Sequence, residues 1–543
     1  MKTDTMHSIL EEPLKELLAI RLGCHKTPTK SLVMEKRLAI PLMEPLAIPL
    51  GCQRTTTKWL VISKPKAIAK WLVICILLSL WNSLAFASEM SDPFGTEAMA
   101  PLKPALRIGG TVGDPCEAQP LDHALNLQEV VNLALCNNPQ THVAWANSLA
   151  QAAQVGVSKA SYLPSAELNA TANHILSGST SNVDQRNVGV TLSYLLYDFG
   201  SRAANLENAR QLLAAAIATQ DSTVQAVFLA AVQDYYQVQA TLAALDAALE
   251  SERAAKESFA AAEARYNAGS ATPADKLQAQ TAYSQATLNR ITTEGNQKNA
   301  QGALANMLGL DANRNVSLVA ANTMSIPNNF EGDINALIEE ARQHRPDLQA
   351  AAAQVKAAEA SADAARAAGR PSISLTASAN QYTIAGIDSH SSLVGINLSV
   401  PIFSGYATTY HVRSAEAQVD VKNGQLEQLR LQVALDVWTA YQNLTTATQS
   451  LRTTADLLDS AEQSARVALG RYKAGVGSIL DVLNAQSALA SARQQRIQST
   501  FNWNISRATL AQSIGSLDAS LLQTLSDASG QQAGENPPQK TQP

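Results

Sequence analysis

The segment VGVTLS at residues 188–193 returns as VGINLS at residues 394–399, 206 positions later (394 − 188). In both copies apolar side chains alternate with small or polar ones, which predicts strands with one apolar and one polar face. A weaker strand precedes each copy, so the sequence predicts two β-hairpins, at about 165–200 and 372–404. Strands of about 10–12 residues suit a tilted transmembrane β-strand.

The same spacing recurs outside the strands. RYNAG at residues 265–269 returns as RYKAG at residues 471–475, and Asn138-Pro139 pairs with Arg345-Pro346 at a spacing of 207. A unit of this size is far longer than a solenoid repeat, so it indicates two copies of a whole helix–strand–helix module. We assign residues 126–308 to repeat 1, residues 334–515 to repeat 2, and residues 309–333 to a linker or equatorial region.

Each strand pair is followed by a very long helix. From Ser201 to Arg265 there is neither a proline nor an interior glycine, which allows a helix on the order of 100 Å. Return helices are predicted at about 274–308 and 480–514, after turns at 266–275 and 472–481. Apolar residues along both long helices step by three and four, which is the heptad pattern of a coiled coil. The two seams are Val224, Phe228, Ala231, Tyr235, Val238, Leu242, Leu245 and Leu249, and Val433, Val437, Ala440, Leu444, Ala447 and Leu451.

The N-terminal region has the order of a secretory signal. Lys66 and Lys70 precede a short apolar run, which continues to the small-residue motif Ala85-Phe86-Ala87. We therefore expect a signal peptide at 66–87 and export of the remaining chain.

The other terminal segments are assigned by composition. Residues 1–65 form a leader to which the sequence gives no role, and our hypothesis is a start site placed too early. Residues 88–125 are rich in proline and glycine and are expected to form an extended arm. The tail, residues 516–543, is polar and is predicted to be disordered.

Composition excludes several classes of function. The net charge of −5 gives no indication of nucleic-acid binding. No phosphate loop, zinc-protease motif or paired C-x-x-C motif is present, so we expect neither an enzyme nor a cofactor or metal site. Transport energy would then have to come from a partner. Cys116 and Cys136 follow the signal, and two cysteines in an exported chain predict one disulfide, with two free buried thiols as the alternative.

Four amphipathic strands are too few to close a barrel. An open sheet in lipid would leave unpaired backbone groups, and known spanning barrels begin at about eight strands. If the strands enter a membrane, several copies must share one barrel, with 8, 12 or 16 strands for a dimer, trimer or tetramer. The alternative is a soluble sheet packed on the helices.

The motifs and their order resemble the TolC-like outer-membrane efflux proteins over about residues 120–515. The resemblance rests on ALCNNP at 134–139, YLP at 162–164, LYDFG at 196–200, PIFSG at 401–405 and the paired Tyr-x-Ala-Gly turns. It implies a homotrimer with a 12-stranded barrel in the outer membrane and an α-helical coiled-coil tunnel in the periplasm. It also implies a periplasmic adaptor, an inner-membrane pump of the RND or ABC type, and export of drugs, other small molecules or polypeptides.

The resemblance also assigns residues to the tunnel entrance. Asp481 matches an acidic position of the periplasmic gate, Tyr472 matches the tyrosine that links the gate, and Asp275 resembles its partner in repeat 1. The second acidic position falls on Asn484 and the gating arginine falls on Gly477, so a double-aspartate, arginine-latched gate is not expected here. Both aspartates also fit a helix capping box, which is a structural alternative to a pore role.

The exposed turns are the expected docking sites for the adaptor: Gly269, Ser270, Gly475, Val476 and Gly477. Gly269 and Gly475 are predicted to adopt left-handed backbone at the helix ends. The rival interpretation of the whole chain is a periplasmic coiled-coil adaptor or scaffold without a channel. An adaptor of that kind would carry a lipoyl-like β segment between its helical arms, where this chain has amphipathic hairpins.

Overall fold

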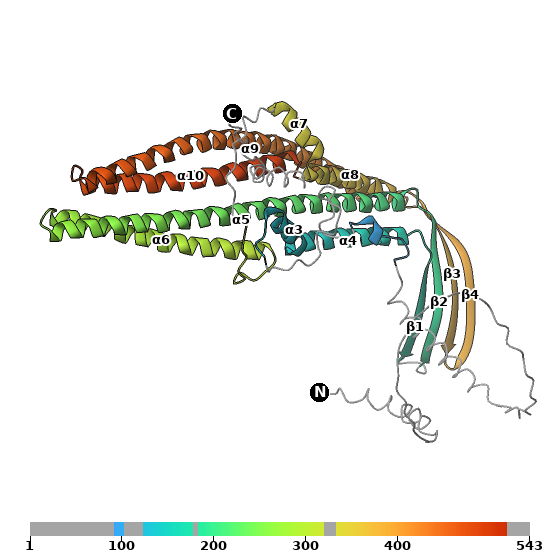
Figure 1. The fold of residues 1–543 in the computed structure, drawn as a ribbon. Coiled ribbons are helices and arrows are strands. Elements are labelled where there is room, and N and C mark those ends of the chain that lie inside the picture. Colours follow the sequence, from blue (N-terminus) through green and yellow to red (C-terminus); the bar gives the residue numbers. More distant parts are fainter. Residues whose placement is uncertain (1–91, 102–122, 177–182, 320–332, 518–543) are drawn as a thin grey trace, which may run out of the picture. The chain divides into compact units, whose positions relative to one another are not determined.

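The described part of the protein contains long helices and one four-stranded sheet (Figure 1). The structure, a computed structural model, describes residues 92–101, 123–176, 183–319 and 333–517. These residues all belong to one compact unit, 89–543. Within it the order helix, helix, strand, strand, long helix, return helix occurs twice, as the duplicated sequence predicts. The proposed leader, signal peptide and tail lie outside the described residues, apart from Ser516 and Leu517 at the start of the tail.

The strands form one antiparallel sheet in the order β1-β2-β3-β4. Leu168 lies opposite Val190, which lies opposite Ala379, so apolar residues of neighbouring strands share a face. Thr191 lies opposite Glu167 and Ser378 on the other face. Within the described residues, each edge strand is paired on one side only. The strand bounds are β1 Ser165–Ile175, β2 Val183–Tyr197, β3 Ser372–Ile384 and β4 Ile387–Ser399.

One strand ends earlier than its sequence pattern suggests. The alternation of apolar and polar residues continues to Ile402, but β4 ends at Ser399. Pro401 follows directly and has no N–H group to donate to a neighbouring strand. The apolar alternation therefore extends beyond the hydrogen-bonded ladder.

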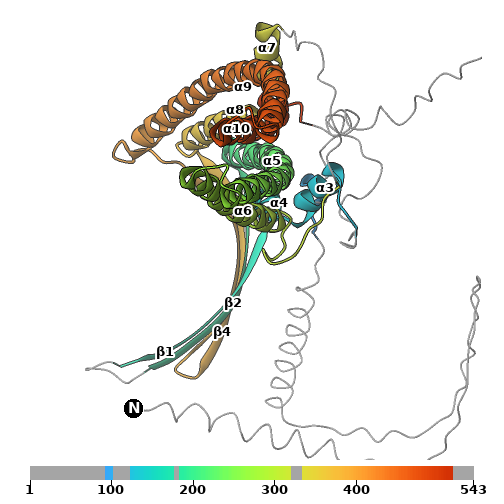
Figure 2. The ribbon, with the colours of Figure 1, turned by 60° about the vertical axis from the view of Figure 1, so that its left-hand side comes forward.

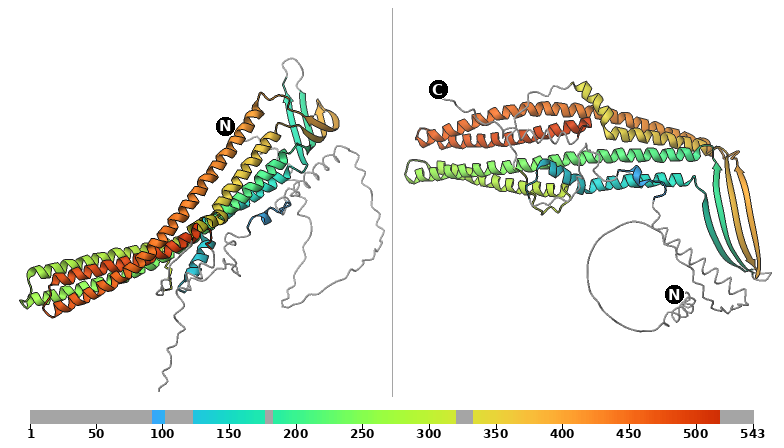
Figure 3. Two further views of the ribbon diagram at one scale, coloured as in Figure 1. Left: turned by 90° about the horizontal axis from the view of Figure 1, so that it is seen from above. Right: turned by 45° about the vertical axis from the view of Figure 1, so that its right-hand side comes forward.

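The helices of the two repeats have matching lengths. Figure 3 shows the four strands beyond one end of the long helices. The turns that join each long helix to its return helix lie at the opposite end. In repeat 1 the helices are α3 Leu127–Asn137, α4 Pro139–Ala160, α5 Ser201–Asn267 and α6 Pro273–Met307. In repeat 2 they are α7 Ile334–His344, α8 Pro346–Ala367, α9 Ala407–Lys473 and α10 Ile479–Ile514.

Local sequence explains where several helices begin. Asn126, Thr272 and Ser478 each form a capping box with the acidic residue three positions later. Pro139 and Pro346 occupy the first position of α4 and α8, where the missing N–H group costs no hydrogen bond. The capping boxes inferred from the sequence at the starts of α6 and α10 are therefore confirmed.

The heptad seams are buried to different extents along the two long helices. On α5, Phe228 is fully buried, whereas Leu249, nearer the turn, is 46% exposed. All six residues of the α9 seam are buried. The helical pairs α5–α6 and α9–α10 lie side by side, and α10 packs against both α9 and α5 (Figure 2).

The N-terminal arm is tied to repeat 1 where it is described. A short 3-10 helix, η2 Glu97–Met99, packs against α4. The indole Nε1 of Trp145 donates to the carbonyl of Pro101 at 2.8 Å, and Lys159 Nζ donates to the carbonyl of Phe94 at 3.2 Å. This part of the arm is held by hydrogen bonds rather than extended into solvent.

Candidate functional site: the turns of the two helical hairpins

The two helical hairpins end in similar turns. Gly269 and Gly475 have φ values of +70° and +81°, so both adopt the left-handed backbone that glycine favours. The N–H of Ser270 donates to the carbonyl of Arg265 at 2.8 Å, and the N–H of Val476 donates to that of Arg471 at 3.0 Å. These are the bonds of a helix C-terminal motif that satisfies the last carbonyls. The predicted left-handed glycines are confirmed, and the turn residues stand exposed beside them.

Both candidate carboxylates cap the helix that follows the turn. Asp275 Oδ2 accepts from the N–H of Thr272 at 2.9 Å, and Asp481 Oδ2 accepts from the N–H of Ser478 at 3.2 Å. The hydrogen bonds from the Ser478 backbone and hydroxyl, with Arg471 nearby, hold the pKa of Asp481 below its usual value. Asp481 is exposed and Asp275 is half-buried, so one carboxylate lies at the start of the return helix in each hairpin.

Tyr472 joins the two hairpins. Its ring is buried and lies under the guanidinium of Arg265, whose Cζ is 4.2 Å from the ring centroid. Arg265 Nη2 also donates to the carbonyl of Tyr472 at 2.7 Å. The ring belongs to an apolar cluster to which both hairpins contribute. The other buried members are Ala262, Ala279, Ile479 and Val482. The cation and the apolar contacts together join the two hairpins at this end.

The structure does not bring Tyr472 and Asp275 together. The Tyr472 hydroxyl is buried without a hydrogen-bond partner among the described residues, and Asp275 bonds to Thr272. The tyrosine–aspartate link implied by the family resemblance is therefore absent within one described chain. The residue that contacts Tyr472 is instead Arg265. Sequence analysis missed this arginine, although the repeated Arg-Tyr pair was a signal that could have identified it.

Gly477 and Asn484 lie near the same turn. A Cβ atom on Gly477 would stand 3.1 Å from both the Cβ of Arg471 and the backbone nitrogen of Tyr472. The chain thus folds closely onto the end of α9, where a larger side chain would force a shift. Asn484 is exposed on α10, one helical turn after Asp481. Its neutral amide adds no charge to the turn.

Aromatic side chains mark the junction between the sheet and the long helices. Tyr197 and Phe199 pack edge to face with ring centroids 4.7 Å apart, and Phe403 and Tyr406 do the same at 5.6 Å. All four are exposed. Exposed aromatic rings beside an apolar band are typical of a membrane–water interface. Sequence analysis did not identify them as a group.

The remaining site predictions fall partly outside the described residues. Cys136 is disulfide-bonded in the structure. Its predicted partner, Cys116, lies outside the described residues, so the pairing stays a prediction. Across the ranges that the structure describes, no group of three or more potential metal ligands is found.

Comparison with known proteins identifies relatives over both repeats. The family model described as outer membrane efflux protein matches residues 130–310 and 337–516. Protein CyaE of Bordetella pertussis is 33% identical over 393 residues, which cover 70% of this chain and 82% of that protein. Outer membrane protein TolC of Escherichia coli is 23% identical, with 77% of this chain and 87% of that protein covered.

A solved structure shares the fold. The crystal structure of a membrane protein from Pseudomonas aeruginosa superimposes with a TM-score of 0.63 and 26% identity, covering 72% of this chain and 93% of that one. The predicted TolC-like fold, mainly α with four β-strands per chain, is thereby confirmed. The match over both repeats also supports the outer-membrane location expected from the resemblance. This chain therefore belongs to the outer membrane efflux protein family.

Proposed function

We propose that three copies of this chain form the exit duct of a tripartite export system. The observation that carries the proposal is the sheet: it has an apolar face, a polar face and two edges that are each paired on one side only. Such a sheet is not stable in lipid unless its edges are paired. Three copies would supply 12 strands, with the apolar faces toward lipid and the polar faces toward a water-filled pore.

The helices would continue the duct into the periplasm. The long helices α5 and α9 have 67 residues each, which corresponds to a length of about 100 Å. Three chains would contribute six such helices and six return helices to a tunnel wall. An inner-membrane pump would supply the energy for transport through this passive duct.

The helical turns are the proposed contact with a periplasmic adaptor. Ser270, Val476 and the two left-handed glycines are exposed at the ends of both hairpins. Because the glycines lack side chains, a partner helix could approach the backbone closely. The pump would be of the RND or ABC type, and the cargo either small molecules such as drugs or polypeptides secreted by a type I system.

The acidic turns are proposed to form the entrance. Asp481 is ionised and exposed, and three copies around a narrow axis would concentrate negative potential there. Asp275 would add charge at the neighbouring turn. Tyr472 would act by holding the hairpins together through Arg265, and Asn484 would contribute a neutral polar surface.

The decisive experiment combines assembly, conductance and partner capture. We expect the mature protein to purify in detergent as heat-modifiable trimers that conduct ions in planar bilayers. A photoreactive cross-linker attached to Gly475→Cys in cells should capture an adaptor protein. The pump encoded in the same operon as that adaptor would show whether the system exports drugs or secretes polypeptides. A water-soluble, non-conducting monomer would refute the duct.

A further inference from the structure

We infer that Arg202 is a positioning residue that fixes the direction in which the sheet leaves the long helix of repeat 1, while the corresponding joint of repeat 2 is compliant. The inference rests on the proposed duct, because it gives each chain one fixed and one compliant joint where barrel and tunnel would meet. It follows from contacts around a single guanidinium that the second repeat does not reproduce.

Each long helix follows a strand through a short connection (Figure 1). Joint 1 is defined as residues 195–204, at the boundary of β2 and α5. Joint 2 is defined as residues 401–410, between β4 and α9, and corresponds to joint 1 at a spacing of 206 residues. The two joints can therefore be compared position by position.

The backbone of both joints is strained at an aromatic residue. Two consecutive residues have positive φ in each joint, Phe199 with Gly200 and Gly405 with Tyr406. The φ values of Phe199 and Tyr406 are +51° and +64°, in a region that bulky side chains rarely adopt. Such a conformation persists only where the surrounding contacts determine it. The contacts around each joint therefore decide how firmly the direction of the strand is fixed.

Arg202 holds joint 1 through both its backbone and its side chain. Asp198 Oδ2 accepts from the N–H of Arg202 at 2.7 Å and from its Nε at 3.2 Å. Arg202 Nη1 donates to the carbonyl of Leu195 at 2.8 Å, and Nη2 donates to that of Leu196 at 3.3 Å. The side chains of Arg202 and Asp198 are only 12% and 13% exposed, so solvent screens this ion pair less than a surface pair.

The carbonyls that Arg202 binds lie where the strand register shifts. β2 pairs with β3 through Leu195 and Tyr197 but not through Leu196, which forms a β-bulge. A bulge leaves one residue outside the ladder and bends the strand. Arg202 supplies a donor to the carbonyl of this residue, so it acts at the position where the strand changes direction.

Arg202 also connects joint 1 to the end of α4. Its Nη1 donates to the carbonyl of Ser161 at 3.4 Å, and its Cζ lies 4.8 Å from the centroid of the Tyr162 ring. A planar guanidinium can stack on a ring and donate in its own plane at the same time, which a lysine ammonium cannot do. One side chain thus joins the end of α4, the end of β2 and the start of α5.

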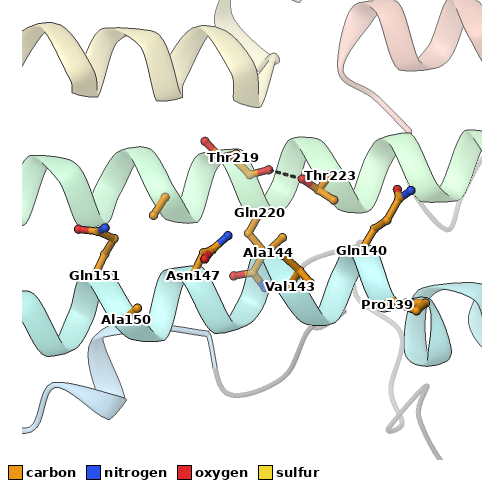
Figure 4. A pocket seen from close by; sticks show the side chains of 11 residues that line it. Pro139, Gln140, Val143, Ala144, Asn147, Ala150, Gln151, Thr219, Gln220 and Thr223 are labelled. Carbon is orange, nitrogen blue, oxygen red and sulfur yellow. Dashed lines mark hydrogen bonds between the residues drawn. The ribbon is translucent and has the colours of Figure 1, made fainter.

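The two helices that Arg202 joins pack more closely near the sheet than further away. Away from the sheet they border an open groove of about 580 Å³, lined by polar side chains of both helices such as Asn147 and Thr219 (Figure 4). Nearer the sheet, Val155 of α4 and Leu213 of α5 are buried in one apolar cluster. Arg202 is therefore anchored to the closely packed end of the pair.

Joint 2 has different residues at the positions that form these contacts. Arg202 corresponds to Thr408. Asp198 corresponds to Ser404, whose hydroxyl oxygen lies 3.1 Å from that of Thr408. The position of the stacked tyrosine is taken by Gly369, where a Cβ atom would stand 2.7 Å from Thr408 Cγ2. The backbone at Gly369 thus lies directly against Thr408, which leaves no room for a stacked ring and guanidinium.

Two further differences favour a firmer joint 1. Arg370 donates to the carbonyl of Phe199 at 3.0 Å, and the residue that corresponds to Arg370 is the apolar Leu163. β2 continues to Tyr197, whereas β4 ends at Ser399, four positions earlier by the repeat spacing. Joint 1 is therefore held by two cations and a longer ladder, and bending between sheet and helices should concentrate at joint 2.

Amide hydrogen exchange on the full-length protein in detergent tests the inference. In the unmodified protein we expect the amides of joint 1 to exchange at least about tenfold more slowly than those of joint 2. Arg202→Gln should raise exchange in joint 1 about tenfold, and Arg202→Lys should restore only part of the protection, because lysine can pair with Asp198 but cannot also stack and bind both carbonyls.

The matched control in repeat 2 is Thr408→Val, which keeps the shape of the side chain and removes its hydroxyl. It should change exchange in joint 2 by no more than about threefold, since the hydroxyl pair is weak and Ser404 is exposed, and should leave joint 1 unchanged. Asp198→Asn tests joint 1 by a milder change if Arg202→Gln does not assemble. It removes the charge of the acceptor and should speed exchange in joint 1 alone.

The outcomes separate this inference from the proposed function. Channels that conduct ions but show equal exchange in the two joints, or no faster exchange in joint 1 of Arg202→Gln and Asp198→Asn, would overturn the inference and leave the duct intact. Faster exchange spread evenly over α5 and β2 would overturn it as well, because it would reflect general destabilisation. Failure of the unmodified chain to form conducting trimers would instead refute the proposed function.

Discussion

At the scale of single residues, the hydroxyl of Tyr472 forms no hydrogen bond within the described residues of one chain. It is buried without a partner among the described residues, while the ring contacts Arg265 and an apolar cluster. We expect Tyr472→Phe to keep or slightly raise the thermal stability of the trimer, because no hydrogen bond is lost. Tyr472→Ala should cost about 3–5 kcal/mol through the cavity it leaves. Thermal dissociation in detergent, followed on gels, measures both; a large loss in Tyr472→Phe would show that the hydroxyl has a partner across the subunit interface.

Arg265 makes two contacts that a lysine cannot reproduce together. Its planar guanidinium stacks on the Tyr472 ring and donates to the Tyr472 carbonyl. We expect Arg265→Gln to loosen the turn by about 1–2 kcal/mol, with faster amide hydrogen exchange at 259–269 and 468–478, and Arg265→Lys to restore only part of the protection. Arg466→Gln, an exposed arginine on α9, is the matched control. Equal exchange in all variants would mean that the stacking does not hold the hairpins together.

Residue-scale contacts were predictable only where they are local. Both capping boxes follow from four consecutive residues, such as Ser478 to Asp481, and the structure contains them. The contact between Arg265 and Tyr472 spans 207 positions, and no local rule specifies which arginine meets which ring. For the same reason the resemblance suggested Asp275 as the partner of Tyr472, which the structure does not show.

At the scale of elements, the periodicity of apolar residues located the strands and helices. The residue at which each element ends depended instead on single side chains. Helix α5 ends at Asn267, two positions beyond the predicted limit at Arg265. Strand β4 stops at Ser399, because Pro401 interrupts the ladder although the apolar alternation continues. A pattern of side chains reports which face an element presents; it does not report where its backbone hydrogen bonds end.

The heptad seam of α5 provides a test of how burial varies along one helix. Phe228 and Leu249 occupy equivalent seam positions, but Phe228 is fully buried and Leu249 is 46% exposed. We expect Phe228→Ala to lower stability by about 3–5 kcal/mol and Leu249→Ala by less than about 1 kcal/mol in the single chain. Chemical denaturation of the detergent-solubilised protein compares the two. A large loss for Leu249→Ala would indicate that assembly buries this residue.

At the scale of the whole molecule, the duplicated sequence predicted two equivalent modules and an incomplete sheet. It did not predict which repeat would cover which surface. Trp438 and Val143 look like ordinary apolar helix residues in the sequence. They are 48% and 61% exposed, whereas Val232 on α5 and Ala350 on α8, at the corresponding positions 206 and 207 residues away, are buried. Which of two corresponding surfaces is covered therefore depends on packing between distant segments, which the periodic pattern of the sequence does not specify.

Three chains would form the entrance together, at the turns between α9 and α10. Asp481 is an ionised, exposed carboxylate at each α9–α10 turn, so three copies would attract multivalent cations. Asp481→Ala should raise single-channel conductance and weaken cation block by about tenfold, since exposed charge pairs are individually weak but three act on one ion. The same change also removes half of a capping box.

Ser478→Ala separates the two roles of this turn. It removes the hydroxyl that accepts from the N–H of Asp481 at 3.1 Å, yet leaves the carboxylate in place. We expect Ser478→Ala to destabilise the start of α10 without changing cation block in planar bilayers. If Asp481→Ala leaves the block unchanged, Asp481 acts only as a helix cap. If Ser478→Ala weakens the block as much as Asp481→Ala does, the position of the turn, rather than its charge, controls the entrance.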